Sequence, residues 1–81
     1  MPQPAPVTID SRGEKCPLPV LRTEKAVARL SKGDRLVVLA TDPVARIDIA
    51  LYCRQNGHEV AVDETEGAMR FEITCGGGED S

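Results

Sequence analysis

The sequence has no tryptophan, and Tyr52 and Phe71 are its only aromatic residues. Without other large aromatic side chains, the core has to be built from valine, isoleucine, leucine and alanine. A chain of 81 residues buries roughly 60% of the surface that it exposes when unfolded, which suits one small core. We therefore expect a single domain over residues 1–81, ordered over about residues 7–75, without room for a large enclosed active site.

Long apolar runs and a secretory signal are also missing. No stretch approaches the roughly 20 apolar residues of a membrane span, and residues 1–6 lack the basic and apolar parts of a leader. We expect a cytoplasmic protein that makes no contact with a membrane. The formal net charge of −3 and the two aromatic residues also argue against nucleic-acid binding, which needs a basic stripe and stacking platforms.

Cysteine is scarce: the chain has three, at Cys16, Cys53 and Cys75. No two of them have the spacing of a metal knuckle, and Pro19 stands where a Cys-x-x-Cys motif would have its second cysteine. We expect no metal site, no bound cofactor and no disulfide scaffold. Cys53 is expected to be a small buried residue on a helix, and Cys75 an incidental thiol on the surface.

Turn residues and apolar periodicity divide the chain into six elements. Alternating or continuous apolar residues predict strands, and apolar residues three and four positions apart predict helices. Asp42 and Pro43 predict the cap and the first residue of the second helix, and Gly33 and Gly57 follow the two helix ends. The order is strand 7–11, helix 17–30, strand 35–41, helix 43–55, strand 59–65 and strand 69–74.

This order predicts an α/β (α+β) two-layer sandwich, in which a mixed four-stranded sheet carries both helices on one face. Helices that return between strands imply parallel neighbours joined by right-handed crossovers. The last two strands should pair as an antiparallel hairpin around Glu66 and Gly67. The chain ends, residues 1–5 and 76–81, are rich in proline or in glycine and acids and are expected to be mobile.

Cys16 lies where the first strand gives way to the first helix, and Pro17 and Pro19 follow it. Proline suits the first turn of a helix, and the upstream Gly13 permits a turn with unusual backbone angles. The positive end of a helix dipole favours the thiolate form of a nearby cysteine. We therefore expect Cys16 to be a reactive nucleophile.

Charge is divided unevenly along the chain. Residues 1–40 hold seven Lys or Arg and four Asp or Glu, whereas residues 41–81 hold three and nine. Arg12, Lys15 and Arg22 lie near Cys16 in the sequence, where they could favour its thiolate or steer an acidic partner surface toward it. A solvated helix face is the simpler explanation of the same pattern.

The run Asp10–Pro19 contains a Cys-Pro-x-Pro element at Cys16–Pro19, with Gly13 upstream. Further downstream stand Gly33-Asp34, Thr41-Asp42-Pro43, Asp48-Ile49, Cys53 and Gly57-His58. Together these positions, from about Val7 to Thr74, resemble the TusA-type (SirA-like) sulfur carrier family. The two-layer sandwich of that family agrees with the order of strands and helices predicted above.

The resemblance implies that Cys16 receives a sulfane sulfur, as a persulfide, from a cysteine desulfurase or a rhodanese-like donor. Cys16 would then pass the sulfur to a cysteine of an acceptor protein, by a relative of thiol-disulfide exchange. The family serves tRNA thiolation, cofactor biosynthesis and sulfur oxidation, and the motif does not separate these. We expect a monomeric, sulfurtransferase-like carrier that turns over no small molecule of its own.

Smaller roles fall to the other residues of this region. Gly13, Pro17 and Pro19 are expected to shape the motif, Asp42 to cap a helix, and His58 to begin a strand without a catalytic task. The candidates for partner docking or for electrostatic effects on Cys16 are Asp10, Arg12, Lys15, Arg22 and Asp48.

Two other classes of function stay open at this point. A small binding or regulatory module would use Cys16 only structurally, and the residue would then be buried and unreactive. A peroxide or disulfide redox protein would instead require Cys16 to pair with Cys53 or Cys75.

Overall fold

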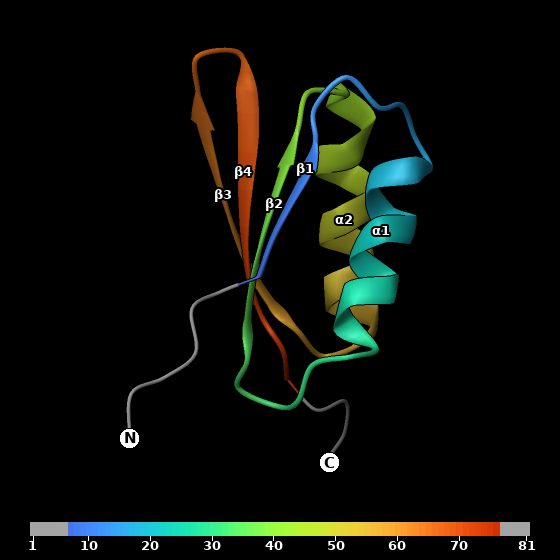
Figure 1. Ribbon diagram of the computed structural model, residues 1–81, viewed down its shortest axis with the longest axis vertical. Coiled ribbons are helices and arrows are strands. Elements are labelled where there is room, and N and C mark those ends of the chain that lie inside the picture. Colours follow the sequence, from blue (N-terminus) through green and yellow to red (C-terminus); the bar gives the residue numbers. More distant parts are fainter. Residues whose placement is uncertain (1–6, 77–81) are drawn as a thin grey trace.

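The computed structural model describes residues 7–76 and confirms the predicted two-layer sandwich. A mixed four-stranded sheet carries both helices on one of its faces, as Figure 1 shows. The elements are β1 (Val7–Ser11), α1 (Leu18–Val27), β2 (Arg35–Ala40), α2 (Pro43–Gln55), β3 (Glu59–Thr65) and β4 (Ala68–Thr74).

The strands lie in the order β1-β2-β4-β3. β1 and β2 are parallel neighbours, as expected for strands joined by a helix, and β3 and β4 form the predicted antiparallel hairpin. The expectation of parallel neighbours is wrong for β2 and β3, because β4 lies between them and pairs antiparallel with β2. The physical reason is burial: β4 buries Met69, Phe71 and Ile73, whereas β3 carries Glu59 and Asp63, which suit an exposed edge.

The core lies between the sheet and the helices. Cross-strand neighbours of β2 and β4 face it in register, as in the pairs Leu36 with Ile73 and Val38 with Phe71. Helix α2 closes the core with Ala45, Ile49 and Cys53, which are spaced four residues apart and therefore share one face of the helix. Residues that fill this core are fully or almost fully buried, which fixes α2 over the sheet.

The helix and turn predictions are largely correct, with one shorter helix. α1 was expected to reach Leu30 but ends at Val27, because the N–H groups of Arg29 and Leu30 turn back to carbonyls three residues earlier. The hairpin turn is at Glu66 and Gly67, where φ is 52° and 80°, the positive values typical of a two-residue type I′ turn.

The prediction for Cys75 is wrong, because this cysteine is buried rather than on the surface. Its N–H donates to the Asp34 carbonyl and its carbonyl accepts from the Gly33 N–H, which ties the end of β4 to the turn before β2. Gly76 follows with its N–H on His58 Nδ1, at 3.0 Å. The mobility expected for residues 1–5 and 76–81 concerns, apart from Gly76, segments outside the described residues.

Among residues 7–76, neither helix has the length and hydrophobicity needed to cross a membrane. The same residues contain no group of three histidine, cysteine or acidic side chains that is arranged to hold a metal ion.

Candidate functional site

Cys16 lies in the loop that joins β1 to α1, two residues before the first helical residue. The loop passes over the end of the sheet where β2 leads into α2 (Figure 1). Two backbone bonds shape it: the Glu14 N–H donates to Ser11, and the Leu18 N–H donates to Lys15 at 2.9 Å. Gly13 has a φ of 84°, the unusual angle that was predicted for it. Cys16 itself is exposed, so the sulfur can be reached from outside.

The two prolines of the motif occupy different environments. Pro19 is the second residue of α1 and is buried, whereas Pro17 precedes the helix and is exposed. The Cys16–Pro17 peptide bond is cis. Because Pro19 has no N–H to leave unpaired, it suits the helix start that the sequence predicted. Cys16 therefore lies just before the N-terminal end of α1.

Asp42 joins the Cys16 loop to the second helix. Its Oδ1 accepts from the Val44 N–H at 3.0 Å, which is the predicted capping bond of α2. Its Oδ2 accepts from the backbone N–H of Cys16 at 2.8 Å, a contact that the sequence did not suggest. Next to it, Thr41 Oγ1 accepts from the Gly13 N–H at 2.9 Å. The junction of β2 and α2 therefore holds the loop in place at two points.

Asp48 contacts the sulfur of Cys16 directly. It lies one and a half turns into α2 and is half-buried, and its carboxylate accepts a hydrogen bond from the Cys16 thiol. This bond raises the pKa of Cys16 above its ordinary value. Partial desolvation and the negative charges of Asp48 and Asp42 act in the same direction.

The prediction of a favoured Cys16 thiolate is therefore wrong. A carboxylate that accepts the thiol proton stabilises the protonated form, so the pKa of Cys16 is raised where the sequence predicted it to be lowered. The sequence alone does not indicate this bond, because Asp48 is 32 residues away along the chain. The only signal was the presence of Asp48 among the family positions.

The nearby basic residues are engaged with carboxylates of their own region. Arg12 makes two 2.8 Å side-chain bonds to Asp10 and lowers the pKa of that carboxyl to about 2. Arg22 bonds to Glu14 through two guanidinium nitrogens, at 2.7 and 2.6 Å. The backbone N–H groups of Cys16 and Val44 lower the pKa of the Asp42 carboxyl, and the charge of Lys15 acts in the same direction. The arginines thus brace the loop and the helix around Cys16. The shift in the pKa of Cys16 comes from Asp48, from desolvation and from Asp42, so the predicted effect of the arginines on the thiolate is not found.

The other two cysteines are separated from this site. Cys53 is fully buried in the core, as predicted, and Cys75 lies beyond the end of β4 that pairs with the start of β2. The Cys16 loop is at the other end of β2, five residues along, which is about 17 Å of strand. All three cysteines are free. This arrangement argues against an internal disulfide of Cys16, and the exposure of Cys16 argues against a purely structural role.

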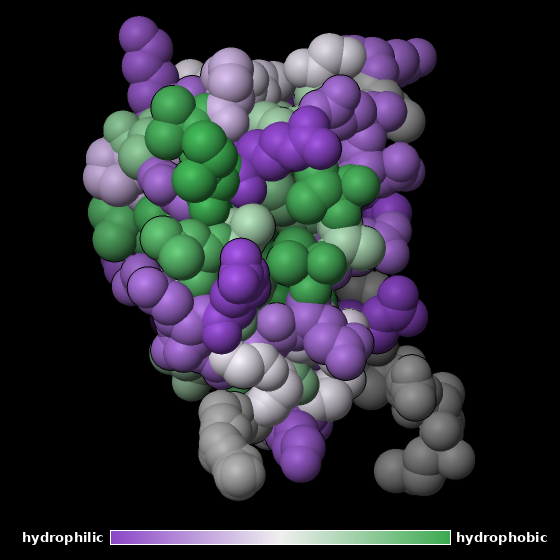
Figure 2. Space-filling model, turned by 180° about the vertical axis from the view of Figure 1, so that it is seen from behind, coloured by the Kyte–Doolittle hydropathy of each residue, from purple (hydrophilic) through white to green (hydrophobic). Residues whose placement is uncertain are grey.

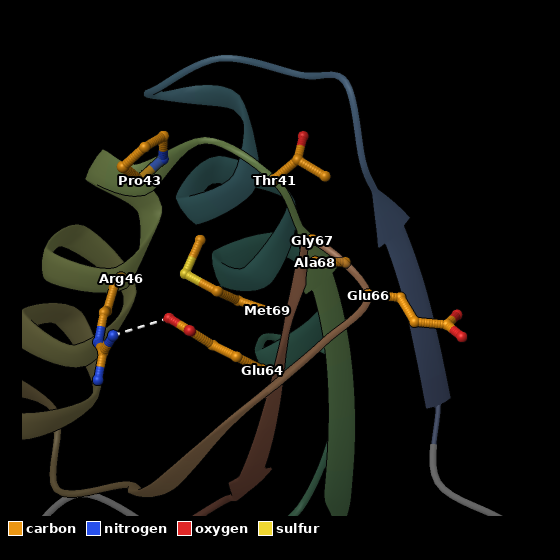
Figure 3. A pocket seen from close by; sticks show the side chains of 8 residues that line it. All are labelled: Thr41, Pro43, Arg46, Glu64, Glu66, Gly67, Ala68 and Met69. Atoms are coloured by element: carbon orange, nitrogen blue, oxygen red, sulfur yellow. Dashed lines mark hydrogen bonds and ion pairs between the residues drawn. The ribbon is translucent and has the colours of Figure 1, made fainter.

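A separate open pocket of about 420 Å³ lies between α2 and the β3–β4 hairpin (Figure 3). Arg46 and Asp48 are two positions apart on α2, so they point about 200° apart around the helix, and the pocket lies away from Cys16. An ion pair of 2.8 Å between Arg46 and Glu64 crosses the pocket. Its lining is Thr41, Pro43, Arg46, Glu64, Glu66, Gly67, Ala68 and Met69.

Known proteins resemble this chain in sequence and in fold. A family model described as Sulfurtransferase TusA matches residues 7–75. Two Neisseria meningitidis proteins, from serogroups A and B, have names that describe them provisionally as sulfur carrier proteins. Each is 52% identical to this chain over 59 residues, which are 73% of this chain and 78% of the relative.

The crystal structure of a SirA-like protein from Desulfitobacterium hafniense superposes on this fold with a TM-score of 0.81. The two chains are 30% identical, and the superposition covers 86% of this chain and 97% of the other. The family match takes in the whole of the described sheet and both helices, together with the loop that bears Cys16. The chain belongs to the TusA family.

Proposed function

We propose that this protein is a sulfur carrier and that Cys16 holds the sulfur as a persulfide. The observation that carries the proposal is the exposed Cys16 on a loop fixed by Asp42, in a chain whose other two cysteines are buried. Membership of the TusA family and the names of the two Neisseria relatives support the same role.

The transfer requires two exchanges at one sulfur. In loading, the Cys16 sulfur attacks the outer sulfur of a donor persulfide, a new sulfur–sulfur bond forms, and the donor cysteine leaves as a thiolate. In unloading, an acceptor thiolate attacks the outer sulfur on Cys16, and Cys16 leaves in turn. Neither step changes the number of electrons, because one sulfur–sulfur bond replaces another. Neither step needs an enclosed pocket, which agrees with the open position of Cys16.

The partners in this proposal are proteins: a cysteine desulfurase or rhodanese-like donor, and an acceptor with a cysteine of its own. Exposed apolar side chains on both helices favour protein partners, since such surfaces commonly mark contact sites. They are Leu18 and Leu21 on α1 and Val44, Ile47 and Leu51 on α2. Figure 2 shows hydrophobic side chains exposed among hydrophilic ones on one face of the molecule.

The proposal also concerns the process that receives the sulfur. tRNA thiolation, cofactor biosynthesis and sulfur oxidation are the three processes that the family resemblance offers. Asp10, Arg12, Lys15 and Arg22 remain candidates for docking either partner. A single domain over residues 1–81, a cytoplasmic location, a monomeric state and the lack of independent small-molecule turnover stay predictions from the sequence.

Mass spectrometry of the loaded protein tests the proposal. Incubation with a cysteine desulfurase and cysteine should add one sulfur, roughly 32 Da, to the peptide that contains Cys16, by the exchange described above. Cys16→Ser should abolish the addition. Cys53→Ala, which alters a buried thiol, is the matched control and should leave it intact. Addition that persists in Cys16→Ser would contradict the proposal, as would no addition from either class of donor.

A further inference from the structure

Cys16 contacts two carboxylates, one through its sulfur and one through its backbone N–H, and among the described residues no cation is bonded to the sulfur. Asp48 accepts from the thiol, and Asp42 accepts from the backbone N–H of the same residue. Of the basic residues close to Cys16 in the sequence, Lys15 acts electrostatically on Asp42, and Arg22 is paired with Glu14. A carrier that only needed a strong nucleophile would place positive charge here, so the acidic surroundings call for another explanation.

We propose that Asp48 controls the proton on the Cys16 sulfur, holding the empty carrier as a thiol and the loaded carrier as a neutral persulfide. This inference rests on the proposed function and adds a direction to it: loading is restrained, and release of the sulfur to an acceptor is favoured.

The restraint on loading follows from the proton balance. Cys16 must lose its proton before it attacks the outer sulfur of the donor persulfide. Asp48 is in place to take that proton as the new sulfur–sulfur bond forms, and the departing donor thiolate then removes it as its own bond breaks. For a neutral donor persulfide, the outer sulfur moves to Cys16 with the hydrogen that it bears, and the Cys16 proton moves through Asp48 to the donor thiolate, so that the donor ends as a thiol. Until a donor is docked, Cys16 stays a thiol and is poorly reactive toward small electrophiles.

The advantage at release follows from the charge on the outer sulfur. A persulfide is more acidic than a thiol, so without a nearby carboxylate the loaded sulfur would ionise readily. An anionic outer sulfur repels an incoming acceptor thiolate, whereas a neutral one can be attacked. By disfavouring a second negative charge next to its own, Asp48 keeps the outer sulfur neutral. The acceptor thiolate then bonds to that sulfur and Cys16 leaves as a thiolate. Cys16 takes up from water a proton equivalent to the one that the acceptor thiol gave up, and its thiol again donates to Asp48.

The pH dependence of alkylation at Cys16 tests the first half of the proposal. Iodoacetamide reacts with thiolates. Mass spectrometry quantifies its product on the Cys16 peptide separately from any product on the peptides that contain the buried cysteines. In Asp48→Asn the rate at pH 7.5 should rise ~3- to 10-fold, since a fall of one pKa unit gives about tenfold more thiolate. Asp48→Ala should also raise the rate, which separates loss of charge from the hydrogen bond that an asparagine amide can donate.

Two matched controls define the specificity. Asp42→Asn removes a carboxylate that contacts the backbone of Cys16 and not its sulfur. This change should raise the rate less than Asp48→Asn does. Glu64→Gln removes a carboxylate paired with Arg46, on another side of α2, and should leave the rate unchanged. An Asp48→Asn rate at or below that of the wild-type protein would overturn the proposal.

Release of the sulfur provides a second readout that a merely structural residue would not alter in this way. The carriers are loaded with sulfur, freed of donor, and mixed with glutathione at pH 7. Asp48→Asn should then lose its sulfur several-fold more slowly than the wild-type protein, although its empty form is alkylated faster. Release that is unchanged or faster would overturn the second half. Absence of loading on Cys16 would instead contradict the proposed function. Failure of the carrier role can therefore be distinguished from failure of the role assigned to Asp48.

Discussion

At the scale of single residues, one cysteine of this chain differs from the other two in its environment. Cys16 is exposed and held by hydrogen bonds to two aspartates of one helix and its cap. Cys53 and Cys75 are buried, and burial raises the pKa of both thiols. Buried thiols in apolar surroundings are inert compared with exposed ones. One sulfur is therefore accessible from outside, while the other two are shielded.

The buried Cys53 predicts sensitivity to alkaline pH. Burial raises the pKa of Cys53 from 9.0 to about 11, so the folded protein holds this proton after the unfolded chain has lost it. The contribution of Cys53 to the free energy of unfolding is fully present below pH 9. It falls by about 2 kcal/mol as the pH rises toward 11. Urea unfolding at pH 8 and at pH 10.5 measures the loss, and Cys53→Ala should lose clearly less between the two pH values. An equal loss in both proteins would contradict this assignment.

At the scale of elements, the junction of β2 and α2 positions the site. Asp42 caps α2 and accepts from Cys16, Thr41 accepts from Gly13, and Asp48 extends from the second turn of the same helix. The first helix contributes mainly its start, with Pro19 buried and Pro17 beside the cysteine. α2 therefore holds Cys16 more directly than α1, the helix that Cys16 precedes in the sequence.

Substitution of Asp42 tests this dependence on α2. Asp42→Ala removes the cap and the acceptor for the Cys16 N–H, and should lower the free energy of unfolding by about 1 kcal/mol. Asp42→Asn keeps a capping oxygen and should lower it by only a few tenths of a kcal/mol. Urea titration of the three proteins gives these values. Equal losses in the two variants, or none in Asp42→Ala, would show that the side-chain bonds of Asp42 are not what anchors the helix.

At the scale of the whole molecule, the sequence predicts local structure better than contacts between distant segments. Asp42-Pro43 marks the start of α2, and the alternation of Met69, Phe71 and Ile73 marks β4. Both signals lie within a few residues, and both predictions are correct. The place of β4 between β2 and β3 depends on how the hairpin buries its apolar face against the helices, which no local pattern encodes.

The same limit applies to the site. Cys16 and its motif are evident from the sequence, because proline and glycine have strong local effects. The bond to Asp48 and the burial of Cys75 depend on folding across the sheet, over 32 residues in the first case. For this reason the sequence predicted a favoured thiolate, whereas the folded protein favours the protonated sulfur. The electrostatics of a site made by two distant segments depends on how the fold brings them together.

One measurement tests the central claim most directly: a time course of labelled sulfur through a complete relay. Heavy-isotope cysteine and a cysteine desulfurase load the carrier, the donor is removed, and glutathione is then added as the acceptor. The account predicts that the label appears on the Cys16 peptide, leaves it after the addition, and is recovered as glutathione persulfide, with Cys16→Ser carrying none. Label that reaches glutathione equally well through Cys16→Ser, or that never occupies Cys16, would contradict the account.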